Sequence, residues 1–572
     1  MEYSAILHDM DKRFCYAIDK DLFVIRVQVK KDDIKEIILH YEDKYIPLEW
    51  KDTRKRIPMK KVATSQFHDY YEAQLQMHLI CLRYYFEFTD MQGEKVYYGN
   101  YEFDKECITN RDRMFDCPQN LREEEMFEVP EWAANKVVYQ IFPSRFAATE
   151  PVDKELWYKA PITPMDDLHG NLRGIIEHMD DIQNLGIDVL YMTPIFQSNS
   201  CHKYDTTDYY KIDPSFGTTE DLKELVQKAH ERGLKVVLDA VYNHTGREFF
   251  AFADILENGE KSKYRDWYFI DGFPLKSEWG EIPNFKCFGY YGGMPKLNLK
   301  NPEVEKYITD VACYWIKECD IDGWRLDVGD EISHFFWKNF RKAVKAVKKD
   351  MLIIGEIWHY AGDFLEGDEW DTVMNYPFYL NLIDLLADEK ITVSQFVQNL
   401  GYLKGRLNKN CYPLMWNLID SHDTARFLHL CNDNKKKQHL AAAFQLLLPG
   451  MPMIYYGDEY AMPGANDPDC RRGMYWDEEY QDKEMYEWYK RLIQVRKSHA
   501  CIVEGELAGS VTEDEEGTVV LIRKNGEETI AMIFNCSSSA KKFNEYTQKY
   551  NLLTENTFDG NVEGFDAAVI VL

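Results

Sequence analysis

Four short apolar runs of this chain end on acidic or histidine side chains. The first, residues 323–328 (GWRLDV), carries Arg325 and Asp327 two positions apart. Side chains alternate along a strand, so these two point to the same side. An arginine within reach lowers the pKa of a carboxyl group, and a carboxylate nucleophile must be ionised. Taken alone, the pair could instead be a buried structural ion pair.

In the other three runs, too, apolar residues lead to acidic or histidine side chains. They are residues 234–244 (LKVVLDAVYNH), 351–358 (MLIIGEIW) and 414–423 (LMWNLIDSHD). Segments with helical periodicity separate the runs, and strands that alternate with helices predict a parallel sheet or barrel. Such a barrel carries its active site at the carboxyl ends of its strands. Packing alone does not explain four such clusters in series, so we predict an active site there.

These four segments resemble, in order, the sequence signatures of the α-amylase family, glycoside hydrolase family 13. Residues 294–298 (MPKLN) and 467–474 (DPDCRRGM) are similar to the branch of cyclomaltodextrinases, maltogenic amylases and neopullulanases. The resemblance covers nearly the whole chain. It implies an α/β fold: a (β/α)8 TIM barrel with an inserted domain after strand 3, an N-terminal β-sandwich and a C-terminal β domain.

Cleavage of a glycosidic bond through an oxocarbenium-like transition state uses a carboxylate and a carboxylic acid, which lie about 5–5.5 Å apart in retaining enzymes. The resemblance implies that Asp327 is the nucleophile and Glu356 the acid and base, with Asp423 as a third carboxylate that grips two ring hydroxyls. Glu356 ends an apolar strand beside Trp358. We expect desolvation and the Asp327 charge to raise the pKa of Glu356.

The resemblance implies a sugar site around these carboxylates. His244 and His422 match positions that hydrogen-bond the same sugar, and Tyr204 matches the stacking platform beneath it. Without the family, a histidine at a strand end is more often structural, and Tyr204 alone would be a core residue.

Four more residues complete the implied site. Asp467 with Arg471 closes the pocket, and Trp358 forms an aromatic wall on the leaving-group side. Asp239 is expected to support the site without contacting sugar.

Outside the barrel the patterns predict β-structure. Residues 1–125 are expected to form a β-sandwich with one wet face, since residues 25–30 and 71–79 alternate apolar and polar. The resemblance implies a starch-binding-like module that mediates homodimerisation; a plain module without sugar contact is the alternative. Residues 503–572 are expected to form a C-terminal β-sandwich, with Asn525-Gly526 as a two-residue hairpin turn.

The barrel is expected to span residues 126–502, after a linker at 120–130. Besides the runs above, its predicted strands are 137–142, 187–192, 372–376 and 453–456. Helices are predicted to begin at Thr218 and to span 301–318 and 485–498. Residues 245–300, which lack long periodicity, are assigned to inserted domain B, and long excursions of this kind are usually functional.

Family members often carry a calcium-ligating run after the first strand. Here that run is 146–153 (FAATEPVD), and its later partner, commonly Gly-Asp, is Gly170-Asn171. Calcium takes several hard oxygen ligands, and few carboxylates remain. We therefore expect no metal and no cofactor, with calcium as the alternative.

The bulk composition constrains the partners. The 572 residues, 45% hydrophobic and 29% charged, fit a soluble protein of two or three domains. A net charge of −29 argues against nucleic acid or an anionic membrane as a partner. The first residues lack a secretory pattern, and the apolar region 441–456 is too short to span a bilayer. Thirteen scattered cysteines suit a reducing cytoplasm, although removal of a signal peptide would leave the same sequence.

We therefore expect a cytoplasmic, homodimeric, retaining α-glucan hydrolase. It would cleave α-1,4-glucosidic bonds in cyclodextrins, maltooligosaccharides and pullulan or starch, with some transglycosylation. The alternative within the family is an α-amylase or a glucanotransferase. The alternative of another class is a catalytically inactive sugar-binding protein, which the intact carboxylates disfavour.

Overall fold

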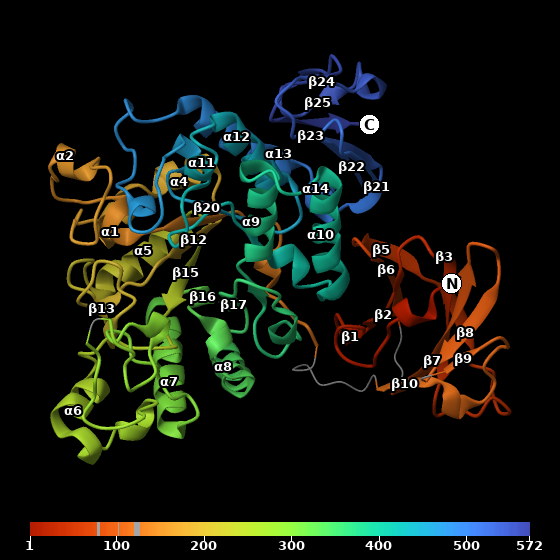
Figure 1. The fold of residues 1–572 in the computed structure, drawn as a ribbon, viewed down its shortest axis with the longest axis horizontal. Coiled ribbons are helices and arrows are strands. Elements are labelled where there is room, and N and C mark those ends of the chain that lie inside the picture. The colour runs from red at the N-terminus through yellow and green to blue at the C-terminus, as the bar shows by residue number, and fades with distance from the viewer. Residues whose placement is uncertain (77–79, 101, 119–125, 279) are drawn as a thin grey trace. The chain divides into compact units, whose positions relative to one another are not determined.

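The computed structural model describes residues 1–76, 80–100, 102–118, 126–278 and 280–572 (Figure 1). The chain divides into two compact units. One comprises Met1–Val129, Tyr360–Asp371 and Ile391–Tyr412; the other comprises Pro130–His359, Thr372–Lys390 and Pro413–Leu572. Across the described ranges, no helix has both the length and the apolar character needed to cross a membrane.

The larger unit is built on an eight-stranded parallel sheet. Its order is β18-β17-β16-β15-β12-β11-β20-β19, and a parallel bridge from Met374 to Trp416 joins the two ends. The strands are β11 (Val138–Ile141), β12 (Val189–Met192), β15 (Lys235–Ala240), β16 (Gly323–Leu326), β17 (Leu352–Gly355), β18 (Thr372–Val373), β19 (Trp416–Asn417) and β20 (Met451–Tyr455). The predicted (β/α)8 barrel is confirmed.

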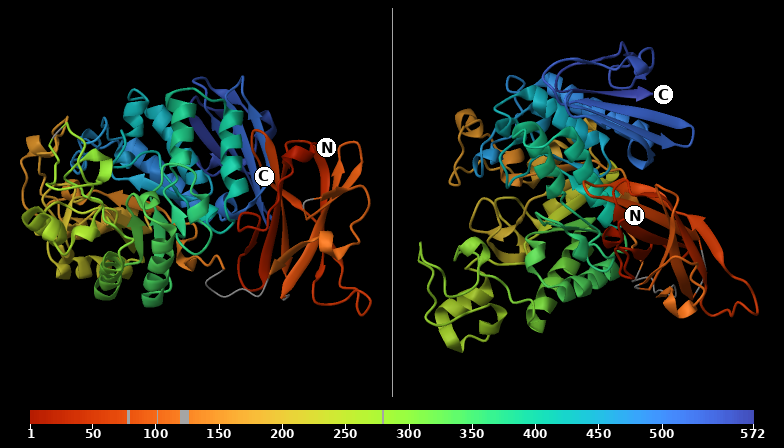
Figure 2. Two further views of the ribbon diagram at one scale, coloured as in Figure 1. Left: turned by 60° about the horizontal axis from the view of Figure 1, so that its bottom comes forward. Right: turned by 45° about the vertical axis from the view of Figure 1, so that its right-hand side comes forward.

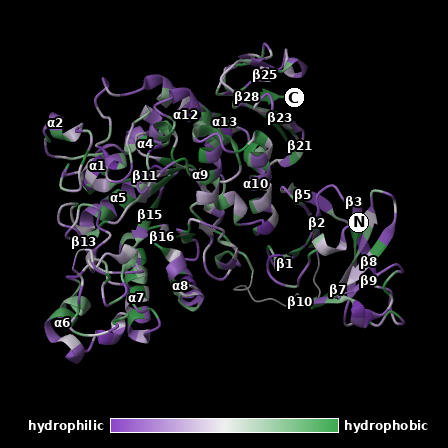
Figure 3. Cartoon of the chain, viewed as in Figure 1, coloured by the Kyte–Doolittle hydropathy of each residue, from purple (hydrophilic) through white to green (hydrophobic). Residues whose placement is uncertain are grey.

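Two barrel strands are shorter than predicted. β18 and β19 have two residues each, where 372–376 and 414–418 were expected. β18 stops early because Asn375 caps helix α9 (Tyr376–Leu382), accepting from Phe378 N, and Pro377 occupies the first turn. Hydrophobic residues concentrate on the barrel strands, and the connecting loops are mostly hydrophilic (Figure 3).

Helices surround these strands, and the predicted ones are present. Thr218 begins α5 (Thr219–Glu231) with a capping box to Asp221, and Asn301 caps α7 (Pro302–Cys319). The others are α1 (Pro143–Phe146), α2 (Lys154–Trp157), α3 (Leu172–Glu177), α4 (Met179–Leu185), α8 (His334–Val347), α11 (Phe427–Leu430), α12 (Lys435–Leu447), α13 (Lys483–Ser498) and α14 (Cys501–Glu504). A small antiparallel pair, β13 (Phe196–Ser198) and β14 (Thr206–Ile212), follows β12.

The segment after β15 contains a helix that the sequence did not predict. It is α6 (Phe250–Asn258), which buries Ala251, Phe252 and Ile255. Nine residues are too few for the periodicity to stand out. The rest of the segment consists of 3-10 turns and isolated bridges, including Cys287 to Pro295.

The C-terminal residues form a sheet beside the barrel helices (Figure 2). Its order is β21-β22-β23-β28-β25-β26, and β24 pairs with β27. The strands are β21 (Glu506–Glu513), β22 (Thr518–Asn525), β23 (Glu528–Asn535), β24 (Lys541–Lys542), β25 (Tyr550–Asn551), β26 (Asn556–Thr557), β27 (Asn561–Val562) and β28 (Asp566–Val571). Asn525 pairs with Glu528, so the hairpin turn is Gly526-Glu527 and the prediction of Asn525-Gly526 was wrong by one residue. Gly526, at φ 60°, supplies the left-handed conformation.

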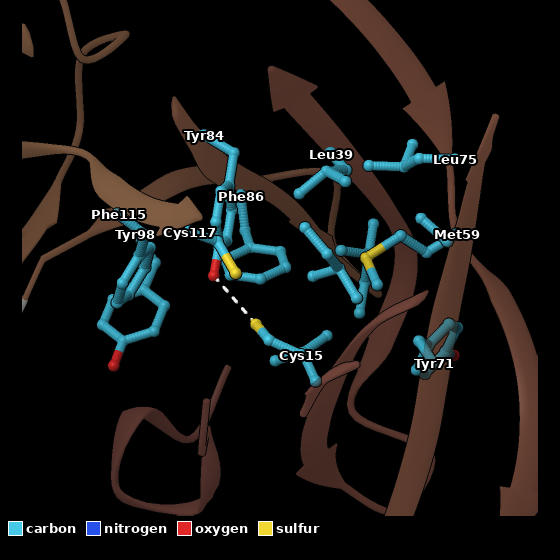
Figure 4. Close-up of a cluster of buried hydrophobic side chains, with 14 of the residues drawn as sticks. Cys15, Leu39, Met59, Tyr71, Leu75, Tyr84, Phe86, Tyr98, Phe115 and Cys117 are labelled. Carbon is cyan, nitrogen blue, oxygen red and sulfur yellow. Dashed lines mark hydrogen bonds between the residues drawn. The ribbon is translucent and has the colours of Figure 1, made fainter. Parts of the chain in front are cut away.

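The smaller unit holds two antiparallel sheets. One has the order β1-β2-β6-β5; in the other, β4-β3-β7-β8-β9, β10 also pairs with β7. The strands are β1 (Cys15–Ala17), β2 (Leu22–Lys30), β3 (Ile34–Asp43), β4 (Lys55–Pro58), β5 (Lys60–Thr64), β6 (His68–Gln76), β7 (Cys81–Asp90), β8 (Lys95–Gly99), β9 (Glu102–Asp104) and β10 (Phe115–Pro118). Their facing side chains form one hydrophobic core (Figure 4).

The predicted wet face of this sandwich is partly covered. Arg26 and Glu72, expected to face water, are buried and paired at 2.5 Å. Arg26 Nη2 donates to Tyr16 Oη at 3.2 Å, and this hydroxyl also accepts from Lys409 N at 3.3 Å. Just before Lys409, α10 (Val393–Arg406) packs on β5 and places Gly405 against the ring of Tyr70. Residues 77–79 of the predicted alternation, and 120–125 of the predicted linker, lie outside the described residues.

Candidate active site

One guanidinium group holds three carboxylates at the ends of neighbouring strands. Arg325 Nη1 lies 2.9 Å from Asp327 Oδ1 and 3.0 Å from Asp239 Oδ2, and Arg325 Nη2 lies 2.8 Å from Glu356 Oε2. Arg325 and Asp239 are buried, and Asp327 and Glu356 are 5% and 6% exposed. The two carboxylates predicted to do the chemistry therefore share one cation, and Asp239 is paired with the same cation.

The backbone after Asp327 is held in an unusual conformation. β16 ends at Leu326, and Val328 has a φ of 47°, which a β-branched residue rarely adopts. Its N–H donates to Glu356 Oε2 at 2.9 Å. This bond fixes the Glu356 carboxyl group against the segment that carries Asp327. Strained backbone of this kind is concentrated at functional sites.

The pKa of Asp327 depends on burial and on its charged neighbours. Burial raises the pKa of Asp327 well above its usual range, the carboxylates of Glu356 and Asp239 act in the same direction, and Arg325 lowers it. Arg325 thus acts in the predicted direction, and desolvation outweighs the ion pair. Asp327 Oδ2 is buried and has no hydrogen-bond partner among the described residues, so it is the oxygen free to attack a substrate.

The third carboxylate, Asp423, lies between a histidine and an arginine. Its Oδ2 is 3.1 Å from His422 Nε2, and its Oδ1 is 3.2 Å from Arg471 Nη2. Arg471 also donates to the His422 carbonyl at 2.7 Å and pairs with Asp467 at 2.7 Å. The structure thus brings together all four of these predicted residues, with Asp467 at the more exposed end.

Tyr204 lies parallel to the ring of His422. The two planes differ by 3°, and Tyr204 Oη is 2.5 Å from His422 Nε2 and 3.2 Å from Asp239 Oδ2. On the other side, Gln140 Nε2 is 2.7 Å from His422 Nδ1. Burial lowers the pKa of His422 well below its usual value, so the ring is neutral. Sequence reasoning missed Gln140, although it is a polar residue in the otherwise apolar strand β11.

His244 is neutral as well. Burial lowers its pKa to about 3, with Lys296 acting in the same direction. Its Nε2 is 3.1 Å from the Tyr204 carbonyl, and its ring stacks on Phe288 at 5.2 Å. His244 therefore lies next to Tyr204, as predicted, and Phe288 from the inserted segment was missed.

Trp358 borders the acid. Its indole stacks on Tyr376 at 3.9 Å, and its Nε1 donates to Glu356 Oε1 at 3.3 Å. The side chain is 42% exposed, so one face remains available. Tyr376, which is buried beneath it, was not predicted because it follows one of the two-residue strands.

The 294–298 motif contacts the segment after Asp327. Lys296 Nζ lies 3.0 Å from Glu331 Oε2 and donates to Asn243 Oδ1. Burial lowers the pKa of Lys296. These contacts, which the sequence did not predict, join the inserted segment to the strand ends.

The residues at the position where family members often bind calcium have other hydrogen-bond partners. Asp153 caps α2 by accepting from Glu155 N at 2.7 Å, and Asn171 caps α3 by accepting from Gly174 N at 2.9 Å. Within the described ranges, no group of three or more His, Cys, Asp or Glu side chains could hold a metal ion. The absence of calcium stays a prediction.

The chain is similar to known proteins over most of its length. Residues 140–480 match the family described as "Alpha amylase, catalytic domain", and residues 1–119 match "Alpha amylase, N-terminal ig-like domain". A cyclomaltodextrinase of Geobacillus thermopakistaniensis is 42% identical, with 94% of this chain and 92% of the relative covered. Neopullulanase 2 of Thermoactinomyces vulgaris is 39% identical, with 94% and 91% covered.

A solved structure of a cyclomaltodextrinase superposes with a TM-score of 0.94 at 36% identity, and the match covers 100% of both chains. Matches of this length and identity, together with the ordered carboxylates at the strand ends, agree with the resemblance. The chain belongs to the alpha-amylase family and is a glycoside hydrolase.

Proposed function

We propose that this enzyme is a retaining hydrolase of α-1,4-glucosidic bonds in cyclodextrins and maltooligosaccharides, with some transglycosylation. The observation that carries the proposal is the arrangement around Arg325, where one oxygen of Asp327 has no hydrogen-bond partner among the described residues and Glu356 is fixed beside it. Relatives named cyclomaltodextrinase, neopullulanase and maltogenic amylase support the choice of substrate.

The reaction follows from the positions of the carboxyl groups. In the reactive state Glu356 carries a proton and Asp327 is ionised. Glu356 donates it to the glycosidic oxygen as the bond breaks, and Asp327 Oδ2 attacks the anomeric carbon to form a glycosyl ester. Glu356, now ionised, then removes a proton from water, which attacks the ester and releases the sugar. A second sugar in place of water gives transglycosylation.

The sugar at the reacting centre is held by the surrounding groups. Tyr204 is the stacking platform, and the neutral His244 and His422 hydrogen-bond the ring hydroxyls. Asp423 grips two hydroxyls, and Arg471 orients it. Trp358 lines the leaving-group side through its exposed face.

We further propose that the enzyme is cytoplasmic, works as a homodimer through its N-terminal β-sandwich (called the N-terminal unit below) and binds no calcium. An intracellular maltogenic amylase of Bacillus subtilis, 38% identical, supports the location. All thirteen cysteines are free thiols, which suits a reducing compartment.

The test compares initial rates on β-cyclodextrin, soluble starch and pullulan, with Asp327→Ala as the reference for background. We expect β-cyclodextrin to be cleaved fastest, to mainly maltose and glucose, and α-configured product to appear first in an NMR time course. Fastest cleavage of starch would instead indicate an α-amylase. No cleavage by the wild type, or equal cleavage by Asp327→Ala, would overturn the proposal.

A further inference from the structure

The turn that follows Asp327 is held by a lysine from the inserted segment. Lys296 Nζ lies 3.0 Å from Glu331 Oε2 and donates to the Glu331 carbonyl at 3.2 Å. It also donates to Asn243 Oδ1. Asn243 Nδ2 in turn donates to Glu331 Oε2 at 3.1 Å. One ammonium group therefore contacts three oxygens, and the asparagine amide closes the cluster.

The backbone around Lys296 fixes where this ammonium group lies. The Leu297 N–H donates to the Asn243 carbonyl at 2.9 Å, and an antiparallel bridge joins Lys296 to His244. Asn243 is fully buried, and the Lys296 side chain is 20% exposed. The lysine is therefore anchored to the chain that leaves strand β15 and reaches across to the segment that leaves β16.

The cluster acts on a short turn whose backbone is strained. Glu331 ends the 3-10 turn η8 (Gly329–Glu331), and its N–H donates to the Val328 carbonyl at 3.2 Å. Val328, which precedes the turn, has a φ of 47°. A β-branched residue keeps this conformation only where its surroundings impose it. The bonds from Lys296 to the side chain and to the carbonyl of Glu331 supply such a constraint.

The same conformation directs the Val328 N–H to the acid. This N–H donates to Glu356 Oε2 at 2.9 Å, and Arg325 Nη2 lies 2.8 Å from the same oxygen. The other oxygen, Oε1, accepts from Trp358 Nε1 at 3.3 Å. Two close N–H donors stabilise negative charge on Oε2. A proton on Glu356 is therefore favoured at Oε1.

We propose that Lys296 is a positioning residue that keeps the acid directed at the glycosidic oxygen. Its ammonium group holds the turn at Glu331, the turn holds the Val328 N–H on Glu356 Oε2, and Oε1 is left to carry the proton. Lys296 acts on the substrate only through this turn. The inference rests on the proposed function, because it requires Glu356 to be the acid.

A direct contact between Lys296 and the sugar would give different kinetics. A residue that positions the acid changes the transfer of the proton, so its loss lowers kcat, and lowers it most for substrates whose leaving group needs protonation. A residue that binds the sugar equally well in the ground state and the transition state changes KM and leaves kcat unaltered. Substrates with different leaving groups therefore distinguish the two roles.

Lys296→Met removes the ammonium group and keeps a long side chain. Lys300→Met, at an exposed lysine of the same segment, is the matched control. We would measure kcat and KM for β-cyclodextrin, kcat/KM for an aryl maltoside with an acidic leaving group, and the melting temperature of each variant. For the aryl maltoside, kcat/KM reports the first step, in which Asp327 attacks and little protonation is needed.

We expect Lys296→Met to lower kcat for β-cyclodextrin by about 10–100-fold and to change KM by less than about threefold. The value of kcat/KM for the aryl maltoside should fall by less than about threefold. Lys300→Met should match the wild type on both substrates. In Lys296→Ala, propylammonium should restore part of kcat for β-cyclodextrin, whereas tetramethylammonium at equal ionic strength should not, since it has no N–H to donate.

Glu331→Gln covers the case in which Lys296→Met does not fold. The Glu331 side chain is 45% exposed, and the substitution removes the ion pair while the bond from Lys296 to the carbonyl remains. We expect the same difference between the two substrates, with a smaller loss of kcat for β-cyclodextrin of about threefold to tenfold.

Equal losses on both substrates, a higher KM at unchanged kcat, or variants with the kcat of the wild type would overturn the positioning role. An equal response of Lys296→Ala to the two ammonium ions would do the same. Glu356→Gln is the reference. If it distinguishes the two substrates and Lys296→Met does not, only this inference fails. If Glu356→Gln does not distinguish them, or if the wild type cleaves no glucan, the proposed function fails and this inference fails with it.

Discussion

Arg325 contacts three carboxyl groups. The excess of carboxyl groups over cations governs the chemistry of the site. A single cation cannot neutralise three buried carboxylates. Burial raises the pKa of Asp327 well above its usual range and that of Asp239 to about 6. The carboxyl groups around Arg325 therefore titrate together, and a pH–rate profile reports apparent pKa values of the group and not of single residues.

The variant Glu356→Gln should distinguish the role of the acid from the role of the nucleophile. The amide cannot donate a proton to a sugar leaving group, so we expect kcat for β-cyclodextrin to fall by about 10²–10⁴-fold. An aryl maltoside with an acidic leaving group needs little protonation, and its first step should lose much less. Burst kinetics on the aryl substrate would show this difference. Asp310→Asn, on the exposed side of α7, is the matched control. Equal losses on both substrates would contradict the assignment.

Asp322, the residue before strand β16, is a buried carboxylate whose pKa is lowered by its neighbours more than burial raises it. It is fully buried, which acts to raise its pKa. The bonds to His230 at 2.7 Å, Lys348 at 3.0 Å and Lys235 at 2.9 Å overcome this and lower the pKa below its usual range. Its stabilisation is therefore present above the unfolded pKa and is lost as pH falls through the folded one.

Asp322→Asn should remove this contribution. The variant leaves two lysines without their buried counterion, so we expect the free energy of unfolding at pH 7 to fall by about 3–5 kcal/mol. Because the wild type itself loses the contribution in acid, the difference should shrink as pH falls below about 4. Denaturant titrations at pH 7 and pH 3.5 would measure it. A difference that is constant with pH would contradict the pairing.

At the scale of elements, helix α10 depends on two glycines that face the sandwich. A Cβ on Gly401 would lie 1.9 Å from the Thr64 carbonyl oxygen, and one on Gly405 would lie 2.3 Å from the Tyr70 ring. The first contact is with backbone of strand β5, which cannot rotate aside. Glycine therefore lets this helix lie directly on the sheet.

Gly401→Ala tests this close approach. Alanine improves helix propensity by about 1 kcal/mol, whereas the clash requires the helix to move off β5. We expect the clash to dominate and the free energy of unfolding to fall by about 1–3 kcal/mol. Urea titrations of the variant and the wild type would decide, and a Gly401→Ala variant more stable than the wild type would contradict the packing.

The same elements show what a sequence can and cannot specify. Asp327 and Glu356 were predictable because a strand's carboxyl end fixes where the next side chain points. Gln140 and Tyr376 were not, since each acquires its role from a partner in the loop after a different strand, His422 and Trp358 respectively. Arg26 was assigned to a wet face because Lys409, which donates to the same Tyr16 hydroxyl as Arg26, comes from a distant part of the chain.

At the scale of the whole molecule, the net charge of −29 and the two-unit organisation bear on assembly. Like charges repel, so association of two such chains must come from a specific surface that outweighs the repulsion, and added salt weakens that repulsion. The proposed homodimer through the N-terminal unit should therefore become tighter as salt increases. Sedimentation velocity at 20 mM and 500 mM salt would measure the dissociation constant.

The dimer and the substrate preference should be linked. If the partner chain narrows access to the site, compact cyclodextrins are favoured over starch only while the dimer persists. We therefore expect the ratio of the β-cyclodextrin rate to the starch rate to fall when the enzyme is diluted below its dissociation constant at low salt, and to recover on adding salt at the same dilution. Each rate is normalised to enzyme concentration, and maltotriose, small enough for either state, is the control. A ratio that stays constant across the dissociation would mean that a single chain sets the preference, and the N-terminal unit would then have no part in substrate selection.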